Sequence, residues 1–147
     1  MTHAFAAAGE GRPFSVGPSQ VRIKVDNADP AGAFSLIEWI IPPGAPAPPR
    51  HVHRRASETF YVIEGELHFP LADETLAASS GSCLHVPAGT PHTLSNPGSI
   101  PARALELFVP GSLMGLVEGV GELLSQGPPD MDAMRELFAR YDSELVF

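Results

Sequence analysis

Four residues in the middle of the chain have the types and the spacing of metal ligands. His51 and His53 are two residues apart, Glu58 follows, and His92 comes after a turn marked by glycine and proline. Successive side chains of a β-strand point to opposite faces, so His51 and His53 would present both imidazoles on one side. Three imidazole nitrogens and one carboxylate suit a first-row divalent metal. The spacing predicts a mononuclear site whose open positions take water, dioxygen or substrate.

The position of Glu58 requires a change of direction in the chain. Its odd spacing from His53 would place it on the opposite face of an uninterrupted strand. A bend in the polar residues 54–56 would restore the alignment. We therefore expect the extended segment to be interrupted between His53 and Glu58.

Strand patterns surround these residues. A stiff, proline-rich loop at residues 42–49 delivers the chain to His51, and Glu64 with Gly65 is typical of a tight turn. Many short strands with turn residues between them indicate a small sandwich or barrel. The expected strands cover residues 21–25, 33–41, 59–63, 66–71, 82–86, 90–95 and 102–109.

The two segments that carry the candidate ligands resemble the paired motifs of the cupin superfamily. The first segment reads G-x6-H-x-H-x4-E-x6-G, with one residue more than usual between the glycine and the first histidine. The second reads G-x5-P-x-G-x2-H-x3-N. The intervening sequence is similar to that of small single-domain bacterial cupins related to quercetin dioxygenases. The motif positions are Gly44, His51, His53, Glu58, Gly65, Gly81, Pro87, Gly89, His92 and Asn96.

This resemblance implies an all-β fold, the antiparallel cupin jelly-roll β-barrel or double-stranded β-helix. It also implies that His51, His53, Glu58 and His92 bind one divalent transition metal per chain. The ligand set suits Fe, Mn, Ni, Cu, Zn and Co alike, so the sequence does not select the metal. The other histidines, His3, His68 and His85, are interpreted as packed or hydrogen-bonded side chains.

Strand alternation predicts which residues accompany the ligands into the barrel. Phe60 and Val62 share the parity of Glu58, and Leu94 and Asn96 share the parity of His92. The predicted substrate pocket is therefore largely apolar and suits an aromatic or otherwise hydrophobic small molecule. The strand at residues 33–41 leaves two alternatives open: either the set Phe34, Leu36, Glu38 and Ile40 faces inward, or the alternate set that includes Trp39.

The chain divides into three expected parts of one domain. Residues 1–20 are rich in Ala, Gly and Pro and predict a loose N-terminal arm, residues 21–110 predict the barrel, and residues 111–147 predict a helical extension. Two helices are expected in this extension, capped by Ser112 and Asp130. We interpret their apolar stripes as packing against the barrel or a second subunit, with a lid over the ligand as the alternative.

Composition excludes several classes of partner. With 147 residues, a net charge of −8 and nine basic residues, the chain lacks the clustered Lys and Arg of a nucleic-acid surface. No apolar run reaches the length of a membrane span, and the N-terminus lacks the pattern of a secretory leader. We therefore expect a cytoplasmic protein that binds a small molecule, and the family resemblance implies a homodimer.

The leading functional hypothesis is a metal-dependent oxidoreductase of the dioxygenase type that acts on an apolar or aromatic oxygenated molecule. Glu58 is the candidate catalytic residue because the resemblance implies that it can bind metal and also accept a proton from a bound hydroxyl. The alternatives are a non-catalytic module that binds a small molecule and a metal-dependent isomerase. An isomerase of sugars or keto acids would need a more polar pocket than Phe60, Val62 and Leu94 provide.

Overall fold

The computed structural model describes residues 3–27 and 32–147. Within these ranges the chain forms ten strands, one short 3-10 helix and two α-helices. The elements are β1 (Arg12–Val16), β2 (Ser19–Val25), β3 (Ser35–Ile41), β4 (His51–His53), β5 (Ser57–Glu64), β6 (Glu66–Pro70), β7 (Thr75–Ser79), β8 (Cys83–Val86), β9 (Ala102–Val109), η1 (Gly111–Leu113), α1 (Met114–Ser125), α2 (Met131–Ala139) and β10 (Ser143–Leu145).

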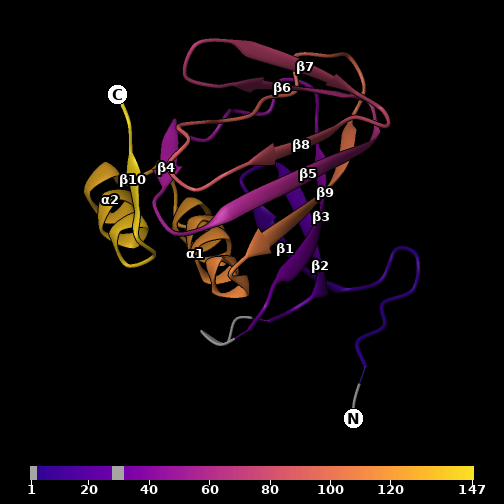
Figure 1. Cartoon of the computed structure of the whole chain (residues 1–147), viewed down its shortest axis with the longest axis horizontal. Coiled ribbons are helices and arrows are strands. Elements are labelled where there is room, and N and C mark those ends of the chain that lie inside the picture. Colours follow the sequence, from indigo (N-terminus) through magenta and orange to yellow (C-terminus); the bar gives the residue numbers. More distant parts are fainter. Residues whose placement is uncertain (1–2, 28–31) are drawn as a thin grey trace.

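The strands form antiparallel layers that close around a common interior. Six of them make one sheet in the order β1-β2-β3-β9-β5-β8, while β4 pairs with β10 and β6 pairs with β7. Two isolated bridges, His51 to His92 and His68 to Ser95, tie the loop between β8 and β9 to the two smaller pairs. In Figure 1 the helices lie together on one side of the strands, beside β4 and β10. This arrangement confirms the expected jelly roll with two C-terminal helices.

Alternating burial shows which side of the large sheet faces the interior. On β3 the inward residues are Ile37 and Ile41, both buried, with Trp39 between them at the wall of the interior cavity. The open choice for this strand is therefore decided in favour of the set that includes Trp39. On β9 the buried residues alternate regularly, and Glu106 is one of them.

The hydrophobic core has two parts on either side of the cavity. One part lies between the sheet and the two helices and includes Ile37, Phe108 and Leu137. The other lies between the sheet and the β6–β7 pair, where the rings of Phe60 and Phe69 are 5.0 Å apart. Members of both clusters line the cavity, and Trp39 packs against both of them.

Three expectations about the elements were wrong. The N-terminal arm is not loose throughout, because residues 12–16 pair with β2 as strand β1, while residues 1 and 2 lie outside the described ranges. The segment 90–95 is not a strand: Pro91 lacks a backbone donor, and only His92 and Ser95 make bridges. Ser112 does not cap α1 with its side chain, since it lies within the 3-10 turn that precedes the helix.

The second helix begins as predicted. The side chain of Asp130 accepts hydrogen bonds from the backbone amides of Asp132 and Ala133, at 3.0 and 3.2 Å. Strands β7 and β10 were not predicted from the sequence. No helix within the described ranges is long and apolar enough to cross a bilayer.

The glycines of α1 allow close packing. A Cβ atom on Gly121 would overlap the backbone oxygen of Ser15 in β1, and one on Gly115 would overlap the hydroxyl of Tyr141. A Cβ on Gly119 would lie 2.7 Å from the tip of the Leu137 side chain in α2. These glycines let α1 lie close to β1 and α2. The contact with α1 therefore helps to hold β1, whose composition had predicted a loose arm.

Substitution of Gly121 tests this packing. Alanine has the higher helix propensity by about 1 kcal/mol, so in an open position Gly121→Ala would stabilise the protein. Because the new methyl group meets the rigid backbone of Ser15, we expect instead a loss of about 1–3 kcal/mol in the free energy of unfolding. Urea denaturation measures the change. The matched control is Gly119→Ala, which meets only a flexible side-chain tip; an equal loss in both variants would contradict the explanation.

Candidate metal centre

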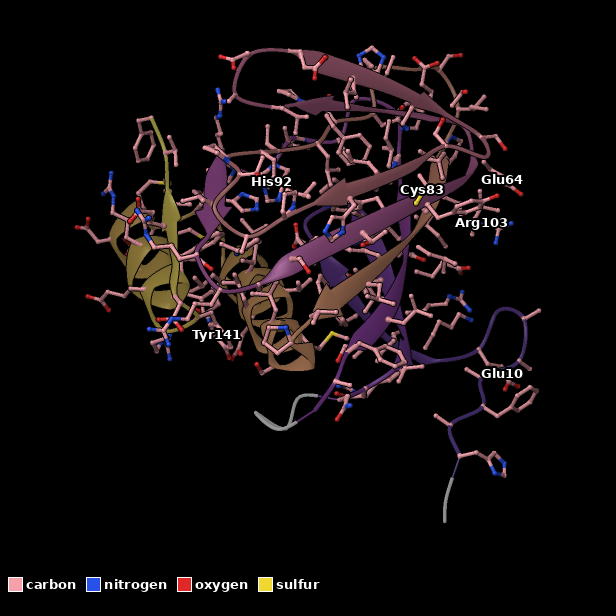
Figure 2. The ribbon with its side chains drawn as sticks, in the orientation of Figure 1. Glu10, Glu64, Cys83, His92, Arg103 and Tyr141 are labelled. Atoms are coloured by element: carbon pink, nitrogen blue, oxygen red, sulfur yellow. The ribbon has the colours of Figure 1, made fainter. Side chains whose placement is uncertain are left out.

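The fold brings the four predicted ligands together from three places in the chain. His51 and His53 lie on β4, Glu58 lies on β5, and His92 faces His51 across a backbone bridge with N–O distances of 3.0 and 2.9 Å. The chain bends at residues 54 and 55, as expected, and this bend returns Glu58 to the face of the imidazoles. One ligand atom of each residue can be chosen so that all lie within 4.8 Å of one another. Figure 2 shows His92 among the strands, whereas Glu64 and Arg103 project from the far edge.

Hydrogen bonds on the outer side of each ring fix the tautomer of the three imidazoles. The Nδ1 atom of His51 lies 2.7 Å from the carbonyl of Pro49, and that of His92 lies 2.9 Å from the carbonyl of Thr90. A carbonyl only accepts, so each Nδ1 carries the proton. Each Nε2 is therefore the atom that can offer a lone pair to a metal.

His53 is held in the same way by a side chain from the C-terminus. Its Nδ1 lies 2.7 Å from the hydroxyl of Ser143 on β10, and this hydroxyl donates to the carbonyl of Tyr141 at 2.9 Å. Because the one hydroxyl proton is used in that bond, Ser143 accepts from His53. The pairing of β10 with β4 places Ser143 directly opposite His53.

The inward nitrogens surround the carboxylate. His92 Nε2 is 2.7 Å from one oxygen of Glu58, and His53 Nε2 is 3.3 Å from the other. The second contact has an ion-pair distance but not the geometry of a hydrogen bond, and His53 Nε2 is a buried atom without a hydrogen-bond partner. An inward-facing buried nitrogen without a partner is costly in a protein interior, and a bound metal ion would satisfy it.

The charges in the cluster shift its pKa values in different directions. Burial lowers the pKa of His51 to about 4, helped by the nearby His92. Burial alone would raise the pKa of Glu58, but the neighbouring His53 and His92 outweigh it and hold this pKa well below its usual range. Burial alone would lower the pKa of His92, but the hydrogen bond to Glu58 and the charge of Glu58 outweigh burial and raise this pKa. The shifts of His92 and Glu58 favour a proton between His92 Nε2 and the carboxylate, at the place where a cation would bind.

These features fit a divalent metal ion. The three Nε2 atoms and one carboxylate form a donor set of borderline character, and metal–ligand bonds of about 2.0–2.2 Å place opposite ligands about 4.2 Å apart. The observed spread of up to 4.8 Å needs only a small contraction. His3, His68 and His85 are not in the cluster: His68 pairs with Glu66 and His85 contacts Thr59.

A cavity of about 430 Å³ opens onto the four ligands. Its walls are mainly apolar, and a volume of this order is usual for small-molecule sites. Phe60 and Leu94 line it, as predicted. Val62 and Asn96 do not: Val62 packs in the core cluster beside β6 and β7, and the Asn96 amide donates to the carbonyls of Ile41 and Ile100. Side-chain parity gives the inward face of a strand, but it does not distinguish the cavity from the core.

The C-terminal helices form one wall of this cavity. They pack against the barrel, as the favoured interpretation held, and they also cover the site. The ring of Phe138 on α2 lies with its centroid 5.3 Å from that of His51. Apolar residues of both helices continue the wall outward: Leu116, Val117, Val120, Leu124, Met131 and Met134.

Three residues of the site were not predicted from the sequence: Glu106, Trp39 as its partner, and Ser143. Glu106 lines the cavity, is 4% exposed, and accepts a hydrogen bond of 2.5 Å from the indole of Trp39. Burial raises the pKa of Glu106 well above its usual range, and the charge of Glu58 raises it further. The sequence did contain a signal for Glu106. It is a glutamate at an inward position of a strand whose other inward residues are apolar: Ala102, Ala104 and Phe108.

Comparison with known proteins agrees with this geometry. Residues 37–108, which include all four ligands, match the family model described as Cupin domain. Quercetin 2,3-dioxygenase of Bacillus subtilis is 34% identical over 86 residues, which are 58% of this chain and 25% of that protein. The chain spans little more than half the length of the first curated relative it matches, at 56%, and less of the others.

The solved structures with a similar fold include two that illustrate the match. KdgF from Halomonas sp. superposes with a TM-score of 0.65 at 22% identity, over 74% of this chain and 94% of that one. The polyketide cyclase RemF from Streptomyces resistomycificus superposes with a TM-score of 0.63 at 23% identity, over 74% and 80% of the two chains. At these identities the similarity establishes the fold alone.

The role of Ser143 gives a first prediction for the site. In Ser143→Ala the Nδ1–H of His53 loses its acceptor, so we expect metal affinity to fall by about 10- to 100-fold. Competition with a chromophoric chelator measures the affinity. Ser35→Ala is the matched control, because Ser35 is a buried serine whose hydroxyl donates to Gly111 instead. Equal loss of affinity in both variants would contradict the role of Ser143.

Metal affinity is also expected to depend on pH. The raised pKa of His92 means that this imidazole keeps its proton to a pH above 6.5, and a metal ion must displace that proton. Below this raised pKa, affinity should therefore fall about tenfold for each unit of decreasing pH, and above it affinity should level off. His51, with a pKa of about 4, adds nothing to this dependence at neutral pH. Chelator competition between pH 5.5 and 9 measures it; a flat profile would show that His92 is not a ligand.

Proposed function

We propose that this chain, in which residues 37–108 form a cupin domain, is a mononuclear-metal oxidoreductase of the dioxygenase type. Its substrate would be an apolar or aromatic small molecule that carries oxygen. The observation that supports this most strongly is the position of the four ligands: they lie at the wall of an otherwise largely apolar cavity. The similarity to quercetin 2,3-dioxygenase of Bacillus subtilis favours the same reaction class.

The residues around the cluster have distinct roles in this proposal. His51, His53, Glu58 and His92 would hold the ion, which when bound supplies Lewis acidity and a path for electrons between substrate and dioxygen. Phe60, Leu94 and Phe138 provide walls that exclude water and favour a planar apolar ligand.

Glu58 is the candidate proton acceptor. Its two oxygens face different imidazoles. One oxygen is 2.7 Å from His92 Nε2, and the other is 3.3 Å from His53 Nε2. In this proposal, the oxygen with the longer contact to a histidine accepts the proton of a substrate hydroxyl. Because the pKa of Glu58 is held well below its usual range, the residue stays a carboxylate at neutral pH and is a weak base. The proton transfer to Glu58 therefore needs a substrate hydroxyl whose own pKa is already lowered.

A non-catalytic binding module is the main rival, since the same covered apolar cavity would retain a ligand without changing it. An isomerase of polar sugars is disfavoured by the small number of polar groups in the walls. Beyond the four ligands, the polar side chains that line the cavity within the described ranges are Ser19, Trp39, Thr93, Ser95 and Glu106.

Oxygen consumption separates the proposal from its rival. The protein is freed of metal, reloaded separately with Fe(II), Mn(II), Ni(II), Cu(II) or Zn(II), and given diphenols or flavonols at an oxygen electrode. We expect substrate-dependent oxygen uptake with at least one redox-active metal, loss of uptake on chelation, and recovery on reloading. Saturable binding of these compounds without oxygen uptake, whichever metal is present, would favour the binding module.

The double variant His51→Ala and His53→Ala tests the ligands themselves. It removes two of the four donors, so we expect the metal content, measured by elemental analysis, to fall from about one ion per chain to none. All oxygen uptake should be lost as well. Circular dichroism checks that the strands are retained. His85→Ala is the control, because His85 is exposed and contacts Thr59 away from the cluster. Stoichiometric metal in the double variant would refute the assignment.

A further inference from the structure

Glu106 lies on the inner face of the large sheet, beside the ligand cluster. On β9 it is directly opposite Ile37 of β3 and Phe60 of β5. Two residues farther along these neighbouring strands, on the same face, are Trp39 and Glu58. Diagonal neighbours on one sheet face are within reach of long side chains. Glu106 is therefore placed between the Trp39 indole and the carboxylate of the cluster.

Among the residues that line the cavity, Glu106 is the one ionisable side chain outside the four ligands, within the described part of the chain. It has 4% of its surface exposed, so what remains accessible faces the cavity rather than bulk water. Sites for small molecules have mainly apolar walls, and a few polar groups in them fix the orientation of the ligand. Glu106 is the polar group best placed to do this next to the metal cluster.

Burial of Glu106 is energetically unfavourable unless its carboxyl group has a specific role. A buried carboxyl group loses its hydration, and a leucine of similar length would fill the same place without that loss. The hydrogen bond from Trp39 compensates one oxygen, Oε2. The other side chain in hydrogen-bonding contact with this carboxyl group is that of Glu58, which is itself a carboxylate. The carboxyl group is thus held by Trp39 on one side and borders both Glu58 and the cavity on the other.

We infer that Glu106 is a specificity-determining residue that contacts the substrate, and that it selects molecules with a hydroxyl group adjacent to the oxygen bound at the His51–His53–Glu58–His92 cluster. Trp39 is the positioning residue that holds the carboxyl group of Glu106 toward that hydroxyl. The substrate class is thereby narrowed from oxygenated apolar molecules to those with two neighbouring oxygen substituents, one of them a hydroxyl.

A hydroxyl is the group that matches Glu106 because it both donates and accepts a hydrogen bond. It can donate to a carboxylate oxygen or accept from a carboxylic acid, so the match does not depend on the protonation state of Glu106. An ether oxygen only accepts, and a hydrogen atom on carbon does neither. A molecule that lacks the hydroxyl would cover the carboxyl group without offering its second oxygen a hydrogen bond, which a site of this kind discriminates against strongly.

Binding to the zinc-loaded protein tests the inference without turnover. Calorimetry compares two matched pairs, catechol with phenol and a flavonol with the flavone that lacks its 3-hydroxyl. The inference rests on the proposed function only in requiring an oxygenated ligand at the cluster, so failure of oxygen uptake would leave it standing. For the wild-type protein we expect the hydroxylated member to bind about tenfold to hundredfold more tightly.

Substitutions assign this preference to Glu106. In Glu106→Leu the preference should fall to about one, while phenol and the flavone bind as well as before or better. Glu106→Gln should keep part of the preference, because an amide also donates and accepts. Trp39→Phe should weaken it without removing it, since the carboxyl group loses its indole partner. The matched control is Glu38→Gln: Glu38 is a buried glutamate next to Trp39 that pairs with Arg103 and does not line the cavity.

Metal content, measured in every variant, separates a substrate contact from a structural role. The inference requires about one zinc ion per chain in Glu106→Leu. Loss of zinc together with equal weakening of both members of a pair would show that Glu106 only positions Glu58, and would overturn it. The inference would also be overturned if the wild-type protein does not distinguish the members of either pair, or if it binds none of the four compounds.

Discussion

The orientation of three imidazole rings is the constraint on which the site depends. Each ring uses its Nδ1–H in a hydrogen bond on the outer side, to Pro49, Thr90 or Ser143, and so presents Nε2 inward. These acceptors come from the proline-rich loop, the turn before His92 and the C-terminal strand. Distant parts of the chain must therefore fold together before the donor set exists. The bridge between His51 and His92 and the pairing of β4 with β10 bring them together.

The same arrangement explains the electrostatics of the interior. Glu58 is buried, which disfavours a charge, but the inward nitrogens compensate and keep it ionised. Glu106 has no such neighbours, so burial and the adjacent carboxylate favour its protonated form. The surroundings of these two glutamates on adjacent strands thus shift their pKa values in opposite directions. The first is suited to bind a cation, and the second is suited to form hydrogen bonds with a ligand.

The sequence predicted the clustering of the four candidate ligands, because the spacing of His51, His53 and Glu58 is local and the resemblance to cupins marks His92. His51 and His53 share a strand, and the bend at residues 54 and 55 could be inferred from the parity of Glu58. The regular strands and the Asp130 cap also depend on short-range patterns. Parity was less informative for the pocket: it placed Phe60 and Leu94 on the inner face correctly, but it could not separate cavity from core at Val62.

The features that could not be predicted depend on long-range packing. Strand β1 looked like a loose arm because its sequence is weakly patterned, and it is held by β2 and by the close approach of α1 at Gly121. Ser143 lies 90 positions from its partner His53, and nothing in the short sequence around it marks a role at the site. Trp39 and Glu106 become partners only when β3 and β9 pair.

X-ray absorption spectroscopy of the metal-loaded protein is the most direct test of the central claim, that one ion is held by three imidazoles and one carboxylate. We expect a first shell of nitrogen and oxygen only, at about 2.0–2.2 Å for zinc, with the multiple-scattering signal of three histidines. Sulfur in the first shell would implicate Cys83, the single and exposed cysteine. That result, or a signal from fewer than three histidines, would contradict the account.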